Sequence, residues 1–117
     1  MINIIALRKM SPSSNFMYKM NFIFAKKGDM KYISHLDLMR LFMRALRRGR
    51  LPIKITEGFS PHPKLSIKRA LKLGIESDNE EAVIVLQVPV SPQEFKERLQ
   101  QQLPEGITIK EAVLNYG

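Results

Sequence analysis

The sequence of 117 residues contains no cysteine and only two histidines, which excludes several kinds of chemistry at once. Without cysteine, the chain forms no disulfide, offers no thiolate nucleophile and provides no cysteine ligand for zinc or an iron–sulfur cluster. This absence fits a reducing compartment, so we expect a cytoplasmic protein without redox chemistry of its own. Only Asp37 and Glu57 are plausible neighbours of the two histidines, and the spacing is not that of a zinc site, so we predict no metal.

Long apolar runs and nucleotide-binding motifs are also missing. The opening MINIIAL is too short to span a bilayer, and the RKM after it reverses the charge order of a secretory signal. We therefore expect neither a membrane anchor nor export. No GxGxxG, GxxxxGK[ST], GxSxG or CxxxCxxC motif occurs, so nothing favours nucleotide binding, a hydrolase or intrinsic radical SAM activity. We predict no cofactor in this chain.

Positive charge is abundant and is unevenly distributed along the chain. From Lys19 to Lys72 there are 14 Lys and Arg residues against three acidic ones, whereas from Ile75 to Gly117 there are 3 against 8. A concentrated basic region creates a local positive potential that suits a polyanion. The formal net charge of +8 is therefore a clue to a binding partner.

The periodicity of apolar residues predicts one α+β domain over residues 18–117, preceded by a loose extension over 1–17. Strands are predicted at 18–26, 51–58, 64–68, 82–88 and 107–114. Helices are predicted at about 35–48 and from Ser91 to Pro104, each after a serine cap. The order β-α-β-β-(β)-α-β is that of a ferredoxin-like split β-α-β fold, with two helices on one face of an antiparallel sheet. That fold serves many functions and does not choose among them.

The first predicted helix carries most of its charge on one side. At 100° per residue, its four arginines and Asp37 fall within an arc of about 100°: Arg40, Arg44, Arg47 and Arg48. Solvation and the helix dipole account well for the last two arginines, which lie near the C-terminal end, and less well for the others. A nearly unmixed arginine stripe repels itself, so it suggests an anionic partner.

The stretch GFSPHPK, residues 58–64, places His62 between two prolines. Pro61 and Pro63 restrain the backbone before any tertiary contact forms, and Gly58 permits a sharp turn. This stiff loop could hold Phe59 and His62 ready for a ligand. It could also be a rigid corner that packs Phe59 into the core, which is the more frequent situation for an aromatic residue beside a Gly/Pro turn.

Residues 32–77 resemble a bacterial family of unknown function that is associated with radical SAM proteins. This stretch is YISHLDLMRLFMRALRRGRLPIKITEGFSPHPKLSIKRALKLGIES. The resemblance rests on SHLD and ALRR in the helix, a GF-N/S-PHP loop and a following LxxGxES, and it extends over residues 18–115. The chain departs from the commonest family pattern at Ile67-Lys68-Arg69, where small residues are frequent. More distantly, the layout looks like that of RNA-processing proteins of CRISPR systems.

The resemblance implies a genomic context. Family members occur fused behind radical SAM proteins or encoded beside them, and some lie near ribonuclease E/G genes. A radical SAM protein is thus the implied partner, and an iron–sulfur cluster and S-adenosylmethionine would come only through that partner.

RNA binding has the broadest support from the residues. The arginine stripe is joined after the loop by four further cations, and two aromatic residues, Phe59 and Tyr32, could stack on bases. These cations are Lys64, Lys68, Arg69 and Lys72. The alternative is a protein-docking module, in which the arginine stripe lies on an acidic face of the radical SAM partner.

His35 and His62 are the only candidates for catalysis. Two imidazoles are the minimum for metal-independent RNA cleavage, in which one removes the 2′-hydroxyl proton and the other protonates the leaving oxygen. The helix dipole at the N-terminal end favours neutral His35, which suits a base. Against this, a capping role for His35 and a turn role for His62 are commoner, so we expect a non-catalytic accessory domain.

Overall fold

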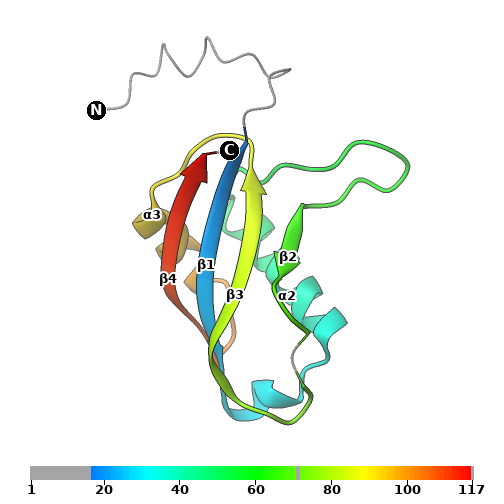
Figure 1. Ribbon diagram of the computed structural model, residues 1–117, viewed down its shortest axis with the longest axis vertical. Coiled ribbons are helices and arrows are strands. Elements are labelled where there is room, and N and C mark those ends of the chain that lie inside the picture. Colours follow the sequence, from blue (N-terminus) through cyan, green and yellow to red (C-terminus); the bar gives the residue numbers. More distant parts are fainter. Residues whose placement is uncertain (1–16, 71, 117) are drawn as a thin grey trace.

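The computed structural model describes residues 17–70 and 72–116, which form an antiparallel sheet with helices on one face (Figure 1). The strands are β1 (Tyr18–Lys26), β2 (Leu65–Ile67), β3 (Ser77–Leu86) and β4 (Ile107–Tyr116). The helices are the 3₁₀ helix η1 (Gly28–Tyr32) and the α-helices α2 (His35–Arg48) and α3 (Pro92–Gln100). The strand order β2-β3-β1-β4 confirms the predicted ferredoxin-like α+β fold. Residues 1–16 of the predicted extension lie outside the described part of the chain.

Central strand β1 defines the two faces of the sheet. Met20, Phe22 and Phe24 point toward the helices and are fully buried, whereas the residues between them lie on the opposite face and are partly exposed. The ring centre of Phe22 lies 5.6 Å from that of Phe42 on α2 and 5.5 Å from that of Phe95 on α3. Both helices therefore share one aromatic core with the sheet, and within residues 17–70 and 72–116 no helix lies on the other face of the sheet (Figure 1).

Serine caps fix the starts of both α-helices, as predicted. The Ser34 hydroxyl accepts a hydrogen bond from the backbone N–H of Asp37 at 3.1 Å, and Ser91 does the same for Glu94 at 3.1 Å. After α2, a Cβ atom on Gly49 would lie 3.0 Å from the carbonyl oxygen of Arg98. The absence of a side chain at this position thus lets the end of α2 approach α3 closely.

Two predicted strands differ from the structure. Strand β3 begins at Ser77, five residues before the predicted start at 82, because its acidic N-terminal half pairs with the end of β1 in spite of its low strand propensity. The predicted strand over 51–58 is wrong. This segment forms only two isolated bridges, Ile53 to Leu86 and Ile55 to Pro63. Proline residues remove the backbone donors that a continuous ladder would need.

The turn between β1 and η1 is held by a contact with the start of β4. Gly106 has a φ of +100°, and a Cβ atom there would lie 2.6 Å from the carbonyl oxygen of Lys27. In return, the N–H of Lys27 donates a hydrogen bond to the Gly106 carbonyl at 2.8 Å. This close approach requires glycine and fixes the end of β1, where several charged residues meet.

Candidate nucleic-acid interface

Helix α2 packs one side on the core and turns its arginines outward. Leu38, Phe42, Ala45 and Leu46 are buried against the sheet. On the other side are the four exposed arginines of the predicted stripe: Arg40, Arg44, Arg47 and Arg48. The amphipathic period of the sequence therefore placed these side chains correctly on the solvent face.

Most of these arginines lack an acidic partner. Arg40 approaches Asp37 at 3.6 Å, and both side chains are more than half exposed, so this pair is weak. Within residues 17–70 and 72–116, no ion pair involves Arg44, Arg47 or Arg48. The stripe thus presents positive charge that the described protein does not neutralise.

A fifth arginine closes the C-terminal end of α2. Arg98 on α3 donates from Nε to the carbonyl oxygen of Gly49 at 2.9 Å, and its Nη2 donates to the carbonyl of Arg50. The remaining nitrogen, Nη1, lies 3.4 Å from Glu94. Arg98 thus donates hydrogen bonds to carbonyl groups that the C-terminal end of α2 leaves without a partner. These bonds also fix the orientation of its guanidinium. Its role in this position is structural.

A shallow groove of about 410 Å³ runs beside the arginine stripe. On one wall are Arg44 and Arg48, and on the other are Gln101 and Gln102 from the segment after α3. Leu41 contributes part of the apolar lining. Guanidinium groups and amides around an apolar floor can bind an anion that carries an uncharged moiety.

The GFSPHPK loop projects from the sheet between α2 and β2 (Figure 1). Thr56 and His62 close it: the Thr56 N–H donates to the His62 carbonyl at 2.8 Å, and the His62 N–H donates to Thr56 Oγ1 at 3.1 Å. The His62 ring is held as well, because Nδ1 lies 2.7 Å from the Ser60 carbonyl oxygen. Gly58 takes a φ of +118°, as the sharp turn requires.

At the tip of this loop, Phe59 is fully exposed. The alternative in which the loop is a corner that packs Phe59 into the core is therefore wrong. An aromatic ring held in water by a stiff, hydrogen-bonded loop gains no burial from folding. The loop instead presents the ring, with Lys64 also exposed at its base.

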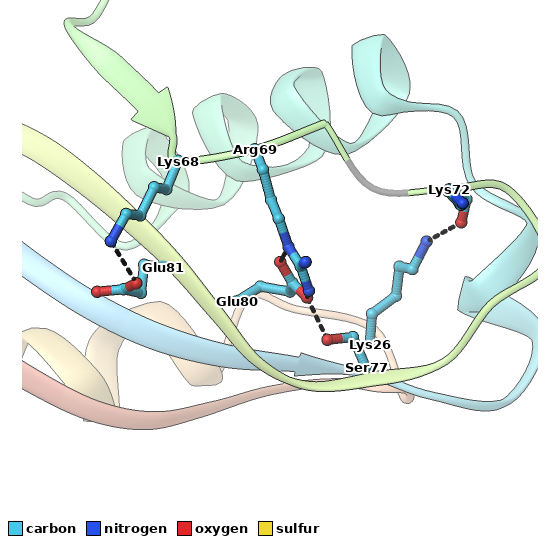
Figure 2. Close-up of polar contacts among 7 residues, drawn as sticks. All are labelled: Lys26, Lys68, Arg69, Lys72, Ser77, Glu80 and Glu81. Atoms are coloured by element: carbon cyan, nitrogen blue, oxygen red, sulfur yellow. Dashed lines mark hydrogen bonds and ion pairs between the residues drawn. The ribbon is translucent and has the colours of Figure 1, made fainter.

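Lys68 and Arg69, in contrast, are engaged within the protein (Figure 2). Lys68 contacts Glu81 at 3.0 Å. The Arg69 guanidinium makes two bonds to Glu80, from Nε at 3.0 Å and from Nη2 at 2.8 Å. Because their charges are paired with carboxylates, these two predicted binding residues are weaker candidates than the α2 arginines.

Glu80 is the centre of this second charged region. Its side chain is 1% exposed and accepts hydrogen bonds from Arg69 and from the Ser77 hydroxyl. These bonds, the Arg69 bond first, lower the pKa of the Glu80 carboxyl in spite of burial. Lys26 is fully buried nearby, and its amine donates to the carbonyl oxygens of Lys72 and Lys31 at 3.3 and 3.5 Å. Burial lowers the pKa of Lys26, and the charge of Glu80 opposes that shift.

The two histidines lie at opposite ends of the sheet. His35 begins α2, just after the Lys26 end of β1, whereas His62 precedes β2 and lies beyond the Leu86 end of β3, which pairs with the start of β1. A helix of 14 residues, about 21 Å long, separates the two regions. The structure therefore does not bring His35 and His62 together. The Nδ1 atom of His35 is buried without a hydrogen-bond partner among the described residues.

Neither a metal cluster nor a membrane span is found in the described residues. Within the ranges 17–70 and 72–116, there is no group of three or more histidine or acidic side chains that could hold a metal ion. No helix in that part of the chain is long and apolar enough to cross a membrane.

The sequence interpretation did not use the helix-free face of the sheet. Lys19 and Lys64 lie there on either side of Val85, and an adjoining hollow of about 480 Å³ contains Asn21, Ser66 and Val83 in its lining. The alternation in residues 18–26 already places Lys19 opposite the core, so one member of this surface was detectable. Lys54 and Lys64 come from the two segments predicted as strands at 51–58 and 64–68, which could form a hairpin, but the sequence does not fix the register that sets these lysines opposite each other.

The fold and this site define a basic, ferredoxin-like α+β domain with an exposed arginine helix. A family model for an "uncharacterized protein conserved in bacteria" (DUF2344) matches residues 19–115, and the chain belongs to that family. This agrees with the bacterial family of unknown function that the motifs suggested. No curated protein and no solved structure matches the chain.

Proposed function

We propose that this domain binds RNA through the exposed arginines of α2 and the GFSPHPK loop. The observation that carries the proposal is that Arg44, Arg47 and Arg48 share an exposed helix face without a carboxylate partner among the described residues. Arginine forms bidentate hydrogen bonds with phosphate, and its flat guanidinium also stacks on bases. A phosphate backbone would neutralise charges that otherwise repel one another.

Exposed Phe59 supports RNA as the anion. Bases of single-stranded RNA stack on exposed aromatic rings, and each stacked base contributes about 1–3 kcal/mol. The two prolines and the Thr56–His62 hydrogen bonds hold the loop in place before binding. Little conformational entropy is then lost when a base reaches the ring.

We further propose that the domain is an accessory unit of a radical SAM protein. Support for this comes from the SHLD…ALRR and GFSPHP motifs and their resemblance to radical-SAM-associated proteins. Because the chain has no cysteine, it offers no thiolate ligands for an iron–sulfur cluster. The cluster and S-adenosylmethionine therefore belong to the partner in this proposal, and the present domain supplies RNA recognition.

Binding without cleavage is the function that the geometry supports. Acid/base cleavage needs two groups within reach of one phosphodiester, and the two histidines lie at opposite ends of the sheet. A protein-docking role for the arginine face is the outcome that the experiment must separate from RNA binding.

The test compares charge-reversed variants of equal net charge. The first variant, Arg44→Glu with Arg48→Glu, changes the stripe, whereas the control, Lys96→Glu with Lys110→Glu, changes exposed lysines outside the predicted binding surface. If about five cations meet phosphates of a single strand, log K against log salt falls with a slope near −3.5 for the unchanged domain. We expect the arginine variant to lose binding to a fluorescent single-stranded RNA and the lysine variant to retain most of it. Equal losses, or no binding at low salt, would overturn the proposal.

A pull-down from native bacterial cytoplasm addresses the docking alternative. Each eluate is divided, and one half is treated with nuclease before its proteins and RNA are identified. RNA that is lost with the arginine reversal supports the proposal. A protein partner that survives nuclease but is lost with the same reversal would assign the arginine face to protein docking instead.

A further inference from the structure

The helix-free face of the sheet carries a row of lysines across neighbouring strands. In the strand register, Lys64 continues the pairing of Leu65 with Ile84 and stands beside Val85, and Val85 pairs with Lys19 on β1. Lys19 points away from the helices, because Tyr18 and Met20 on either side of it are buried. Val85 pairs with Lys19 and therefore lies on the same face, although it is itself largely covered. Lys64 and Lys19 therefore lie on the same outer face, two strands apart.

Lys54 adds a third cation to this row. Ile55 pairs with Pro63, which places Lys54 directly opposite Lys64. Backbone bonds fix both beside Val85: the Lys54 N–H donates to the Val85 carbonyl at 2.9 Å, and the Val85 N–H donates to the Lys64 carbonyl at 3.1 Å. We call Lys19, Lys54 and Lys64 the lysine row.

Like charges directly opposite each other on paired strands are destabilising. None of the ion pairs within residues 17–70 and 72–116 involves a member of the lysine row. The row ends on β4 at Asn115, which pairs with Lys19 and carries no charge. This end of the outer face therefore holds an uncompensated positive charge that a bound anion would stabilise.

Next to the lysine row, the outer face forms a hollow of about 480 Å³. The next row of paired residues contains Ser66, Val83, Asn21 and Val113, and Ile23 and Glu111 lie in the row beyond. Apolar side chains thus stand beside a hydroxyl, an amide and a carboxylate. A hollow of this size and composition suits a small planar group with polar edges.

The two halves of the outer face differ in charge, and this sets an orientation for the ligand. Lys68 in the far row is already paired with Glu81 at 3.0 Å, and Glu111 there has no ion pair among the described residues. Phosphates are favoured at the lysine row and disfavoured at this acidic end. Successive rows on one face of a strand are about 7 Å apart, which is within the span of one nucleotide.

We infer that the open face of the sheet is a second contact surface for single-stranded RNA, with phosphates on the lysine row and an unpaired base in the adjoining hollow. The inference rests on the proposed function and deepens it, since a base that enters the hollow cannot be paired in a duplex. It also adds a surface on the side of the sheet opposite α2.

The closing experiment uses two triple variants of equal charge. Lys19→Gln, Lys54→Gln and Lys64→Gln remove the lysine row, and Arg40→Gln, Arg44→Gln and Arg47→Gln remove three charges from α2. A short single-stranded RNA is titrated into each protein, and the methyl signals of Ile23, Val83 and Val113 are followed by NMR. Unchanged methyl spectra without RNA provide the control for folding.

We expect single-stranded RNA, but not a duplex of the same sequence, to shift these methyl signals. The lysine variant should bind at least about tenfold more weakly and lose about 2 from the magnitude of its salt slope, because three phosphate contacts are removed. The methyl shifts should persist in the arginine variant at saturating RNA. This result would support the inference.

Other outcomes separate the inference from the proposed function. One outcome is that the unchanged protein binds RNA, the arginine variant does not, and the methyl signals never move. In that case the open-face inference fails and the proposed function stands. If the methyl signals move and only the lysine variant loses affinity, the open face is the binding surface and the α2 proposal fails. If no RNA binds at low salt, both fail.

Discussion

Two groups of cations in this domain, those at the Lys26 end of β1 and those on α2, differ in what surrounds them. At the Lys26 end of β1, three cations contact carboxylates of β3: Lys27 contacts Asp78 at 2.7 Å, Lys68 contacts Glu81, and Arg69 binds Glu80 through two bonds. On α2, three exposed arginines have no carboxylate partner among the described residues. The charge of a side chain therefore does not tell whether it is available to a ligand, because this depends on the groups that the side chain contacts.

Strand β3 causes this division. Its first half is acidic and lies antiparallel to the end of β1, so Glu80 stands opposite Phe24 on the helix side and Glu81 stands opposite Ile23 on the outer side. The cations that follow β2 meet these carboxylates directly. Helix α2 has only Asp37 on its exposed face, which leaves most of its arginines to solvent or to a partner.

Removal of the buried carboxylate should have the largest effect on stability. Glu80→Ala leaves Lys26 buried without its nearby negative charge and removes the acceptor of Arg69 and Ser77. Loss of one partner from a buried charged group costs about 3–5 kcal/mol, so we expect the free energy of unfolding to fall by about 3 kcal/mol. Urea unfolding measures this change. A loss below about 1 kcal/mol would mean that the contacts of Glu80 do not stabilise the fold, and the two groups of cations would then not differ as described.

Acid should weaken the same region through protonation. The pKa of Glu80 lies below its ordinary value of 4.5 because of its hydrogen bonds to Arg69 and Ser77, and the pKa of Asp78 is lowered by Lys27. A carboxyl with a lowered folded-state pKa stabilises the fold fully above its ordinary pKa, and this contribution is lost as pH falls through the folded-state value. We therefore expect the urea midpoint to decline as the pH falls below 4.5.

The matched variant for this pH experiment is Glu80→Gln, which cannot titrate at this position. Its midpoint should decline less steeply with acid than that of the unchanged protein. Parallel declines would show that other carboxyls are responsible. Lys26 contributes in the same direction but at higher pH, because a lysine whose folded-state pKa is lowered below 10.5 makes the fold more stable as pH rises through that range.

A smaller effect is expected at the exposed pair beside Glu80. Lys68 and Glu81 are 72% and 55% exposed, so their contact is screened by water. Glu81→Ala should cost no more than about 1 kcal/mol, since exposed ion pairs contribute about 0–1 kcal/mol. The urea midpoint measures this difference, and Glu81→Ala also serves as the control for Glu80→Ala at the adjacent residue. Equal losses from the two variants would contradict the distinction between buried and exposed carboxylates.

The sequence predicted those parts of the fold whose local pattern and tertiary role agree. Strand β1 and helix α2 have the predicted bounds, because alternation and the helical period coincide with burial. The acidic start of β3 was missed, since local propensity disfavours the strand that pairing with β1 imposes.

The residues of the candidate site likewise divide into those that the sequence predicts and those that depend on tertiary contacts. The arginine face follows from the helical period alone, so it was predictable. The engagement of Arg69 depends on Glu80, eleven residues later on a neighbouring strand, and the lysine row depends on the register of a bridge between Ile55 and Pro63. No single-sequence pattern contains that register.

The smallest effect on stability is expected where we propose the largest effect on RNA binding. In the double variant Arg44→Ala and Arg48→Ala, the loss of Arg48 near the helix C-terminus costs about 0.3–1 kcal/mol through the dipole. Arg44 and Arg48 are like charges at i, i+4, so removal of their repulsion stabilises the helix by about 0.2–0.5 kcal/mol. The urea midpoint should therefore remain nearly unchanged while affinity for single-stranded RNA falls. If this variant is instead as unstable as Glu80→Ala, the α2 arginines are held by the fold as firmly as Arg69, and the two regions do not differ in the way that the ion pairs indicate.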